Sequence, residues 1–417
     1  MVPNGWEEKS LKDICKKTIS YGIVQTGENI ENGVPCVRVV DLSKNTLNPV
    51  EMIKTSDEIH QSYKKTILCE GELMMALRGE IGLVKKVTPE LVGANITRGL
   101  ARLSPIKSVD SDYLLWTLRS NKIKNELSKK SGGSALQEIA LGSLRKVVLP
   151  IPPLPEQRKI AQILSTWDRG IATTEKLIDA SKQQKKALMQ QLLTGKKRLV
   201  DPETGKAFEG EWEEKAFSNF FDIGSSKRIL QSEWKESGIP FFRTRELVSL
   251  ANRKPFSSEI FISKELYSAI ANKYGKPKSG DFLVSGVGTL GISYLVKESD
   301  EFYFKDGNVL WFKSLGNIDS KFFKYCFESD LVQNQIINQT TITTVGTYTI
   351  TNAKQTKFLC PPNHREQQKI ASVLTAADKD IELLEAKLAH FKQEKKALMQ
   401  QLLTGKRRVK VTETEAA

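Results

Sequence analysis

The sequence predicts an α+β protein with a pseudo-two-fold internal repeat, in which two mixed α/β domains are separated by two long helices that form an antiparallel coiled coil. Three observations predict this fold. The twelve residues KKALMQQLLTGK occur twice, at 185–196 and 395–406. Each copy closes a long stretch of helix-forming residues with heptad spacing of its apolar side chains. The segments before these stretches hold short apolar runs broken by glycine, proline and asparagine, which are typical of strands and turns.

The repeat divides the chain into two half-chains. Its offset is 210 residues (395 − 185), and it extends without a gap back to Glu156 and Glu366. Weaker similarities continue upstream, where Trp6-Glu-Glu-Lys9 matches Trp212-Glu-Glu-Lys215, and Gly33-Val-Pro-Cys-Val-Arg38 resembles Gly238-Ile-Pro-Phe-Phe-Arg243. The predicted boundaries are 1–152 for the first domain, 153–206 for the central helix and linker, 207–362 for the second domain, and 363–417 for the C-terminal helix and tail.

The two long helices are predicted at residues 155–193 and 365–403. Pro155 suits a first helical turn, and Gly195 and Gly405 suit helix C-termini. Apolar residues alternate at spacings of three and four, which predicts a seam along each helix. The predicted seam residues are Ile160, Leu164, Trp167, Ile171, Ile178, Leu188, Leu192, Ile370, Leu374, Ile381, Leu384, Leu388, Phe391, Leu398 and Leu402. An apolar stripe of this length needs a partner, and we expect each helix to pack against its own repeat.

Two points about this helix pair have alternative interpretations. An antiparallel pair is expected, and a parallel pair is the alternative. Lys185 and Lys395 occupy the same seam position. These lysines either set the register, as buried polar residues of coiled coils do, or extend their ammonium groups into water.

Within the two domains the predicted elements are short. Strands are expected at Val34–Val40, Leu73–Leu77, Val147–Ile151, Phe282–Ser285, Ile292–Val296 and Val309–Phe312. Helices are expected at Tyr113–Ser128 and Lys321–Asn338. Each half-chain is therefore expected to form a compact domain with long loops.

Composition and charge exclude several classes of protein. A formal net charge of +14 over 417 residues favours a polyanionic partner such as nucleic acid. The sequence has no run of about 18 apolar residues, and its N-terminal residues MVPNGWEEKS contain no apolar signal core, so neither a membrane span nor secretion is expected. The five cysteines are scattered without a CxxC pair and the three histidines are dispersed, so neither a disulfide framework nor a metal site is expected. We therefore expect a cytoplasmic protein.

Familiar catalytic motifs are not found in the sequence. It contains neither the [DN]PP[YF] loop of adenine methyltransferases nor the GxxxxGK[ST] loop of ATP-binding proteins. The proline pairs in Ile151-Pro-Pro-Leu154 and Cys360-Pro-Pro-Asn363 fit helix starts instead. Residues 286–291 match GxGxxG, but a strand rather than a helix is expected after them, so we interpret them as a glycine-rich turn. The chain itself is not expected to be an enzyme.

Taken together, these features resemble the specificity subunit of type I restriction-modification enzymes, and the resemblance covers essentially the full length. It rests on the alternation of variable domains and repeated helices, and on several short segments. These segments are Val2–Trp6, Pro35–Arg38, Pro240–Arg243, Gly280–Leu283, 153–158 (PLPEQR) and 188–195 (LMQQLLTG). The second helix start, Pro362-Asn-His-Arg-Glu-Gln367, departs slightly from the family pattern but keeps Glu-Gln.

The resemblance implies a division of labour within a bacterial or archaeal host-defence complex. Each domain would be a target recognition domain that binds one half of a split DNA site, and the helix pair would set the spacer between the halves. Two methylation subunits carrying S-adenosylmethionine would dock on the chain and methylate adenine. Restriction subunits, which use ATP and Mg²⁺, would join through the methylation subunits, and this chain would hold no cofactor. Because the two domains differ in sequence, the full site is expected to be asymmetric.

Candidate DNA contacts are polar or charged residues of glycine-rich loops. They are Gln25, Arg78, Glu80, Arg98 and Arg102 in the first domain, and Ser226, Lys227, Arg228, Arg243, Arg245, Ser285 and Thr289 in the second. Arginine commonly contacts guanine, and glutamine contacts adenine. The alternative for each is a structural or solvated role, and Arg38 and Arg243 are the candidates for a shared structural role.

Basic clusters follow both long helices and have two interpretations. They are Lys196, Lys197 and Arg198 after the first helix, and Lys406, Arg407, Arg408 and Lys410 after the second. They either contact DNA phosphates or complement the negative end of the helix dipole.

Two other functions are alternatives to DNA specificity. A non-catalytic coiled-coil scaffold would carry its charge incidentally, and strongly salt-dependent DNA binding would count against it. A stand-alone nuclease would have an unrecognised site and would show metal-dependent cleavage by the purified chain.

Overall fold

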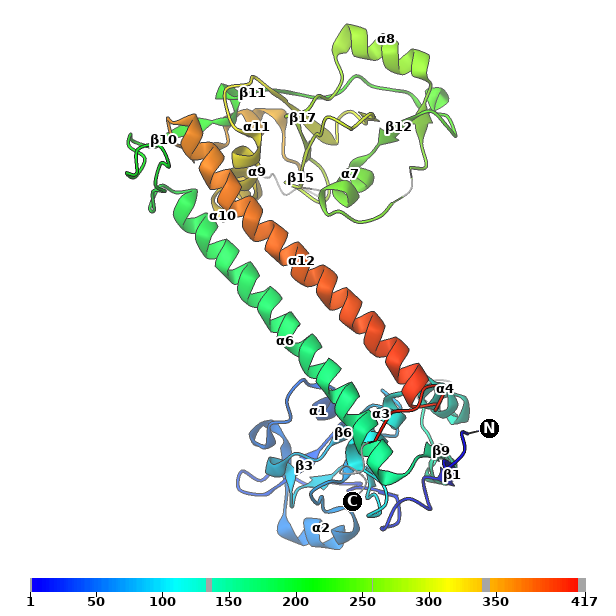
Figure 1. Cartoon of the computed structure of the whole chain (residues 1–417). Helices are drawn as coiled ribbons and strands as arrows, with labels where there is room; N and C mark the ends of the chain where they lie inside the picture. Colours follow the sequence, from blue (N-terminus) through cyan, green and yellow to red (C-terminus); the bar gives the residue numbers. More distant parts are fainter. Residues whose placement is uncertain (1, 133–136, 257, 340–345, 412–417) are drawn as a thin grey trace. The chain divides into compact units, whose positions relative to one another are not determined.

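The computed structural model describes residues 2–132, 137–256, 258–339 and 346–411, and it divides into two compact units. The first unit combines Met1–Lys176 with Ala386–Ala417, and the second is Leu177–Glu385. Each unit therefore contains one mixed α/β domain, the N-terminal part of one long helix and the C-terminal part of the other. This confirms the predicted α+β fold of two domains and a long helix pair (Figure 1).

The domain of the first unit is built from short elements. Its strands are β1 Glu7–Ser10, β2 Ser20–Tyr21, β3 Val34–Val37, β4 Ile53–Thr55, β5 Leu73–Ala76, β6 Val84–Lys86, β7 Asn95–Ile96, β8 Leu100–Leu103 and β9 Val148–Ile151. Its α-helices are α1 Val39–Ser43, α2 Asp57–Ser62, α3 Ser111–Arg119, α4 Asn121–Lys130 and α5 Leu141–Arg145, with 3-10 turns at Pro49–Glu51, Lys64–Thr66 and Pro89–Leu91. An antiparallel sheet has the order β2-β8-β5-β6, and a second sheet has the order β4-β3-β7 with β3 and β7 parallel.

The domain of the second unit repeats this plan. Its strands are β10 Glu213–Ala216, β11 Phe221–Gly224, β12 Ile239–Phe242, β13 Phe261–Ile262, β14 Phe282–Ser285, β15 Ser293–Leu295, β16 Tyr303–Phe304, β17 Val309–Ser314 and β18 Lys357–Cys360. Its helices are α7 Thr244–Ala251, α8 Lys264–Tyr274, α9 Ser320–Glu328, α10 Asp330–Asn338 and α11 Ile350–Gln355, with 3-10 turns at Phe217–Asn219 and Gln231–Glu233. The sheets have the equivalent orders β11-β17-β14-β15 and β13-β12-β16, so the repeat extends to the topology.

Two predicted elements end earlier than their apolar content suggested. The strand from Val34 stops at Val37 because the Arg38 backbone N–H donates to the Asp41 carboxylate at 3.0 Å, which starts α1 and takes Val39 and Val40 into a helix. The predicted helix 113–128 is two helices, since Ser120 ends α3 and its hydroxyl caps α4. The second unit has the same break at Ser329.

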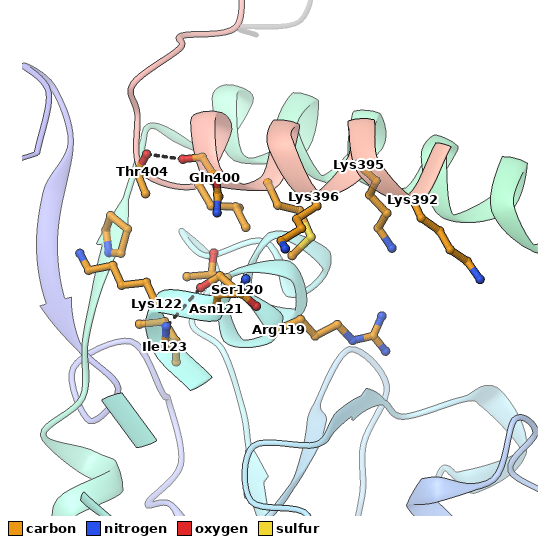
Figure 2. A pocket seen from close by; sticks show the side chains of 14 residues that line it. Arg119, Ser120, Asn121, Lys122, Ile123, Lys392, Lys395, Lys396, Gln400 and Thr404 are labelled. Atoms are coloured by element: carbon orange, nitrogen blue, oxygen red, sulfur yellow. Dashed lines mark hydrogen bonds between the residues drawn. The ribbon is translucent and has the colours of Figure 1, made fainter. Parts of the chain in front are cut away.

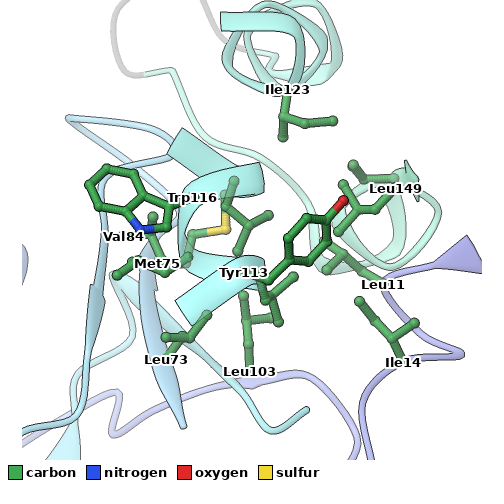
Figure 3. Packing of buried hydrophobic residues seen from close by; sticks show 14 of the residues in the cluster. Leu11, Ile14, Leu73, Met75, Val84, Leu103, Tyr113, Trp116, Ile123 and Leu149 are labelled. Carbon is green, nitrogen blue, oxygen red and sulfur yellow. The ribbon is translucent and has the colours of Figure 1, made fainter. Parts of the chain in front are cut away.

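The core of the first unit lies between its antiparallel sheet and α3 (Figure 3). Tyr113 is fully buried, and its hydroxyl donates to the backbone oxygen of Pro150 at 2.7 Å. The same apolar cluster includes Ile160, Leu164 and Leu402 from the long helices. The second unit has an equivalent cluster that includes Leu192, Ile370 and Leu374. The ends of the long helices are therefore part of the domain cores.

The long helices are α6 Leu154–Leu192 and α12 His364–Leu402, each of 39 residues. Both begin and end one residue before the predicted bounds. In the first unit, Asp168 pairs with Lys395 and Glu175 pairs with Lys392, so the two helix segments run antiparallel. In the second unit, the pairs Lys185–Asp378 and Lys182–Glu385 give the same direction and register.

None of the fifteen predicted seam residues is exposed. At the middle of the seam in the first unit, Trp167 and Phe391 make an edge-on contact with ring centroids 5.5 Å apart. The Phe391 ring also lies beside Gly170, where a Cβ would be in ordinary van der Waals contact with it, 3.7 Å from Phe391 Cε2.

The contacts of the two seam lysines, Lys185 and Lys395, favour the interpretation that these residues set the register of the helix pair. The ammonium of Lys185 lies 2.6 Å from Asp378 Oδ1, and that of Lys395 contacts Asp168 of the opposite helix segment. Each lysine also lies over an aromatic ring of its own unit, Tyr325 at 5.2 Å and Trp116 at 4.4 Å. Burial alone would raise the pKa of Asp378, but hydrogen bonds from Lys185 and Tyr325 outweigh it and lower that pKa.

The repeated Glu-Gln pair at each helix start has a structural explanation. Gln157 accepts from the backbone N–H of Asp110 at 2.8 Å, and Gln367 accepts from that of Asp319 at 3.0 Å. Both amides also donate to backbone oxygens in the segment before the helix. These glutamines therefore attach the start of each long helix to the N-terminal cap of a domain helix.

The basic clusters after the helices divide into two groups. Arg198 forms a bidentate pair with buried Glu366, and Arg408 forms one with buried Glu156. These two arginines attach the end of one long helix to the start of the other, which is neither of the roles predicted for them. The remaining basic residues are exposed: Lys196, Lys197, Lys406, Arg407 and Lys410.

Candidate nucleic-acid interface

A groove of about 470 Å³ in the first unit brings together two of the predicted DNA contacts, Arg78 and Arg98. It is lined by Ile23, Val24, Thr26, Arg38, Val39, Val40, Arg78, Gly79, Thr97, Arg98 and Gly99. The lining comes from the segment after β2, the start of α1, and the loops that follow β5 and β7. Three arginines and no carboxylate line it. Arg38 is paired with Asp41 beside the groove, so Arg78 and Arg98 supply the positive charge that suits it to DNA.

Within this groove, Arg78 lies against Gly99, the residue that follows Arg98 in the chain. Arg98 is exposed and Arg78 is half-buried. A Cβ at Gly99 would lie 3.2 Å from Arg78 Nε and 2.8 Å from Val39 Cγ2, so only glycine lets the arginine lie against this loop. Two apolar side chains are exposed at its rim, Val24 at 46% and Val40 at 59%.

The other first-domain candidates lie beside the groove or outside it. Gln25 is exposed between the lining residues Val24 and Thr26. Glu80 is exposed after Gly79 and accepts a hydrogen bond from Ser43 at 3.1 Å. Both therefore remain accessible to a ligand.

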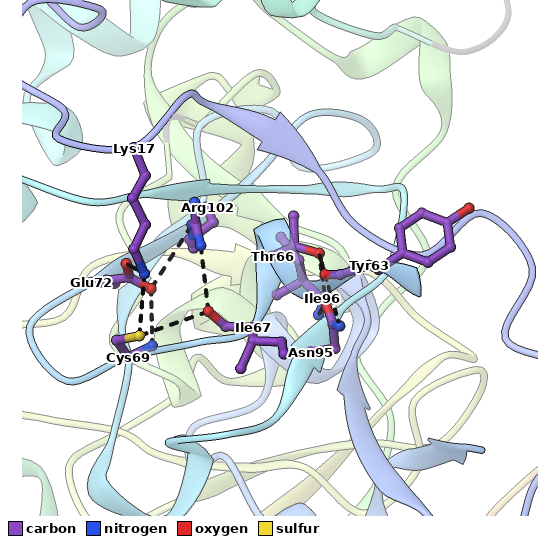
Figure 4. Close-up of polar contacts among 9 residues, drawn as sticks. All are labelled: Lys17, Tyr63, Thr66, Ile67, Cys69, Glu72, Asn95, Ile96 and Arg102. Atoms are coloured by element: carbon purple, nitrogen blue, oxygen red, sulfur yellow. Dashed lines mark hydrogen bonds and ion pairs between the residues drawn. The ribbon is translucent and has the colours of Figure 1, made fainter. Parts of the chain in front are cut away.

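Arg102 is a correction to the predicted site. It lies in the central strand β8, where it is 3% exposed, and its guanidinium pairs with buried Glu72 at 3.9 Å (Figure 4). Lys17 donates to the same carboxylate at 3.1 Å. Arg102 is therefore a structural residue and cannot contact a base in this structure.

In the second unit, the segment after β11 carries three predicted residues. Ser226 donates to the backbone oxygen of Phe304 at 2.8 Å, which fixes the loop, while Lys227 and Arg228 are exposed. Arg228 is 73% exposed and pairs with Asp306 at 2.8 Å. Lys227 and Arg228 are available to DNA, and Ser226 positions them.

Arg243 and Arg245 belong to a carboxylate network at the start of α7. Arg243 pairs with Glu246 at 2.7 Å, as Arg38 pairs with Asp41 in the first unit, which confirms a shared structural role. Arg245 also pairs with Glu246, and with exposed Glu259. These hydrogen bonds raise the pKa of Arg245. Arg245 is 58% exposed on its side chain and can contact a ligand, whereas Arg243 is mostly committed to its partners.

Ser285 is a second correction, because it is fully buried and its hydroxyl accepts from the backbone N–H of Ile292 at 2.9 Å. It closes the turn between antiparallel β14 and β15, which is the glycine-rich turn predicted for 286–291. Thr289 is exposed at the tip of that turn. The equivalent turn of the first unit, between β5 and β6, carries Arg78 and Glu80.

The two domains present different side chains at equivalent positions. The backbone N–H of Thr97 donates to Val37 O, and that of Lys305 donates to Phe242 O, which aligns the loops after β7 and β16. Arg98 of the first unit then corresponds to Asp306 of the second. An exposed cation in one domain is thus replaced by a carboxylate in the other.

Sequence reasoning predicted only Arg78 and Arg98 among the groove residues, and the exposed Val24 and Val40 and the neighbouring Thr97 are among those it missed. Val24 was assigned no role, and Val40 was placed in the predicted strand Val34–Val40 rather than at a surface. Thr97 directly precedes the predicted Arg98, but the two-residue strand β7 that positions it was not predicted from the sequence.

Other kinds of site find no support among the described residues. No three His, Cys, Asp or Glu side chains there lie close enough together to hold a metal ion. The five cysteines are free, and burial raises the pKa of Cys15 and Cys36 to about 11 and that of Cys360 to about 12, so these thiols stay protonated near neutral pH. No described helix is long and apolar enough to cross a bilayer.

Comparison with known proteins identifies the family. The family described as type I restriction modification DNA specificity domain matches residues 3–182 and again 209–393. The chain belongs to this family. The two matches cover most of both half-chains, so the specificity domain occurs twice, as the repeat predicted.

Individual members of the specificity family are similar over the full length. The specificity subunit of the type I restriction enzyme MjaVIII from Methanocaldococcus jannaschii is 29% identical over 98% of this chain and 94% of its own. The putative MjaX specificity subunit of the same organism is 26% identical over 98% and 95%. Such coverage shows that the whole repeated architecture is shared.

Solved structures of this family have the same fold. A chain from a study of complex assembly and conformational transition of the type I restriction-modification system has a TM-score of 0.61 at 16% identity, over 98% of this chain and all of that chain. The specificity subunit of M. genitalium has a TM-score of 0.57 at 13% identity, over 97% and 98%.

Proposed function

We propose that the chain gives a type I restriction-modification complex its DNA sequence specificity, with each domain binding one half of an asymmetric bipartite site. The observation that carries this proposal is the occurrence of the DNA specificity domain twice, in two units that present different side chains at equivalent loops. Since base contacts depend on individual side chains, different loops bind different half-sites.

Affinity and base choice come from different residues in this proposal. The net charge of +14 supplies phosphate contacts that do not depend on sequence. Base contacts come from accessible loop residues. These are Gln25, Arg78, Glu80 and Arg98 in the first unit, and Lys227, Arg228, Arg245 and Thr289 in the second.

The helix pair sets the spacer and docks two methylation subunits, to which restriction subunits attach. S-adenosylmethionine, ATP and Mg²⁺ act in those partner subunits, and this chain contributes no catalytic group. The ion pairs that fix the antiparallel register in each unit support the spacer role, because a fixed register gives a single separation. The complex acts on DNA in the cytoplasm.

Replacing Arg78 and Arg98 together by alanine is expected to weaken specific DNA binding by the assembled complex. Each lost arginine contact to a base costs about 1–3 kcal/mol of discrimination. The affinity is measured by fluorescence anisotropy, with duplexes that contain the site methylated by the complex and with duplexes of scrambled sequence. The ratio of the two affinities gives the specificity. Arg169→Ala is the control, because this exposed arginine lies on α6 of the same unit, away from the groove. Equal specificity in the double variant and the control would contradict the assignment of the groove.

A further inference from the structure

A second cavity in the first unit lies between the C-terminal part of α12 and the junction of α3 with α4 (Figure 2). Its volume is about 340 Å³. It is lined by Thr117, Arg119, Ser120, Asn121, Lys122, Ile123, Pro150, Lys392, Lys395, Lys396, Met399, Gln400, Leu403 and Thr404. We call it the basic pocket, because five of these residues are cations and none is a carboxylate.

The basic pocket combines an apolar part with a cationic rim. Ile123 and Leu403 are buried, and Met399 is half-buried beside them. In Figure 2 the side chains of Lys395 and Lys396 extend from α12 toward the α3–α4 junction. A ligand that fits this lining has an apolar group for the interior and negative charge for the rim.

The cations of the pocket are only partly neutralised by the protein. Lys392 and Lys395 pair with Glu175 and Asp168. Arg119 is half-buried and donates to the backbone oxygen of Val84 at 3.2 Å, and burial lowers its pKa. Among the described residues, Lys122 and Lys396 form no ion pair, so these two lysines line the cavity without a carboxylate partner, while Asp168 acts electrostatically on Arg119.

The second unit provides an internal comparison, because its long-helix segment has the identical sequence KKALMQQLLTGK. The capping serines Ser120 and Ser329 align α4 with α10. At the positions of Arg119, Asn121 and Lys122, the second unit has Glu328, Asp330 and Leu331. Lys186, which is equivalent to Lys396, pairs with Asp330 at 3.1 Å. The difference between the units is at this one lysine: Lys186 has a carboxylate partner, whereas the structure shows no ion pair for Lys396.

We propose that the basic pocket of the first unit binds an acidic, amphipathic segment of a methylation subunit, with an apolar side chain in the cavity and carboxylates on Arg119, Lys122 and Lys396. This inference rests on the proposed function, since it requires that the chain assembles with methylation subunits. Because the equivalent place in the second unit carries its own carboxylates, only one of the two proposed methylation subunits binds the chain through such a segment. The two units, although repeated in sequence, therefore differ in how they bind a methylation subunit.

A protein segment fits this pocket better than a DNA phosphate does. Phosphate contacts are made by exposed cations on surfaces that follow the duplex. Here Leu403 and Ile123 are buried within the lining, and Arg119 is only half-buried. A pocket with an apolar interior and a charged rim is typical of a site that binds an anchoring side chain at a protein interface.

The test is the charge-reversed variant Lys122→Glu/Lys396→Glu, assembled with the purified cognate methylation subunit. Both lysines are exposed, so the fold should be retained, which circular dichroism checks. We expect affinity for the methylation subunit to fall by about tenfold or more, with a weaker salt dependence than the wild type. The control is Lys186→Glu, which carries the same change in the identical helix sequence and should leave the affinity within about threefold of the wild type.

Zero-length carbodiimide cross-linking of the wild-type complex identifies the groups in contact. The expected products join Lys122 or Lys396 to an Asp or Glu of the methylation subunit, and Lys186 gives none. Unchanged affinity in the double variant, an equal loss in Lys186→Glu, or a loss of DNA affinity without loss of partner affinity would each overturn this inference. Failure of the wild-type chain to bind any methylation subunit would instead overturn the proposed function itself.

Discussion

Replacing Leu374 by aspartate is expected to unfold the second unit. Leu374 is fully buried where α12 packs into the domain core, together with Ile370 and Leu192. An aspartate there either buries an unpaired carboxylate or forces the cluster open, which costs at least about 4 kcal/mol in free energy of unfolding. Leu164→Asp should have the same effect in the first unit, because Leu164 is equally buried beside Ile160 and Leu402.

Urea unfolding followed by circular dichroism measures this effect, and gel filtration with the methylation subunit measures its consequence for assembly. The matched controls are Leu383→Asp on α12, where the leucine is 69% exposed, and Leu177→Asp on α6, where it is 50% exposed. These controls should differ from the wild type by less than about 1 kcal/mol. Unchanged stability and assembly in Leu374→Asp would contradict the packing of the helix pair into the domains.

Replacing Glu366 by alanine is expected to have the next largest effect, a loss of about 3 kcal/mol in the free energy of unfolding. Glu366 is fully buried and accepts two hydrogen bonds from Arg198, at 2.6 and 2.8 Å. Removing one partner of such a pair leaves the other charge without compensation, which is costly in a partly buried site. Glu156→Ala should behave similarly in the first unit, where Arg408 and the Trp6 indole N–H donate to Glu156.

The neighbouring ion pair of Glu203 with Arg365 is the control for this prediction. Their side chains are 63% and 60% exposed, so Glu203→Ala should cost no more than about 1 kcal/mol. Chemical denaturation of Glu366→Ala, Arg198→Ala and the double variant gives the coupling between the buried partners. A coupling energy between Arg198 and Glu366 of no more than about 1 kcal/mol, as expected for an exposed ion pair, would show that they do not hold the helix ends together.

The long helices could be predicted to within one residue, because the repeat and the heptad spacing are strong signals over 39 positions. The glutamate and glutamine pairs at the helix starts were visible as repeats, but their partners were not. Arg198 and Glu366 are 168 residues apart, and only the folded chain brings them together.

The DNA contacts were harder to predict, because most of them lie in loops between strands that are only two to four residues long. Arg98 and Arg102 are four positions apart, yet one is exposed in a loop and the other is buried in the central strand β8. Ser285 and Thr289 differ in the same way across one turn. Short strands give too few alternations to show which side chains face the core. The structure therefore removes Arg102 and Ser285 from the candidate site and retains their neighbours.

The central claim is that the two domains specify two different half-sites at one fixed separation. A genome-wide map of adenine methylation, from cells that express the chain with its methylation subunit, tests it most directly. We predict a single split motif with two unlike half-sites and one spacer length, which disappears when the chain is deleted. A map from an intact complex that shows no split motif, or one with identical half-sites, would contradict the claim.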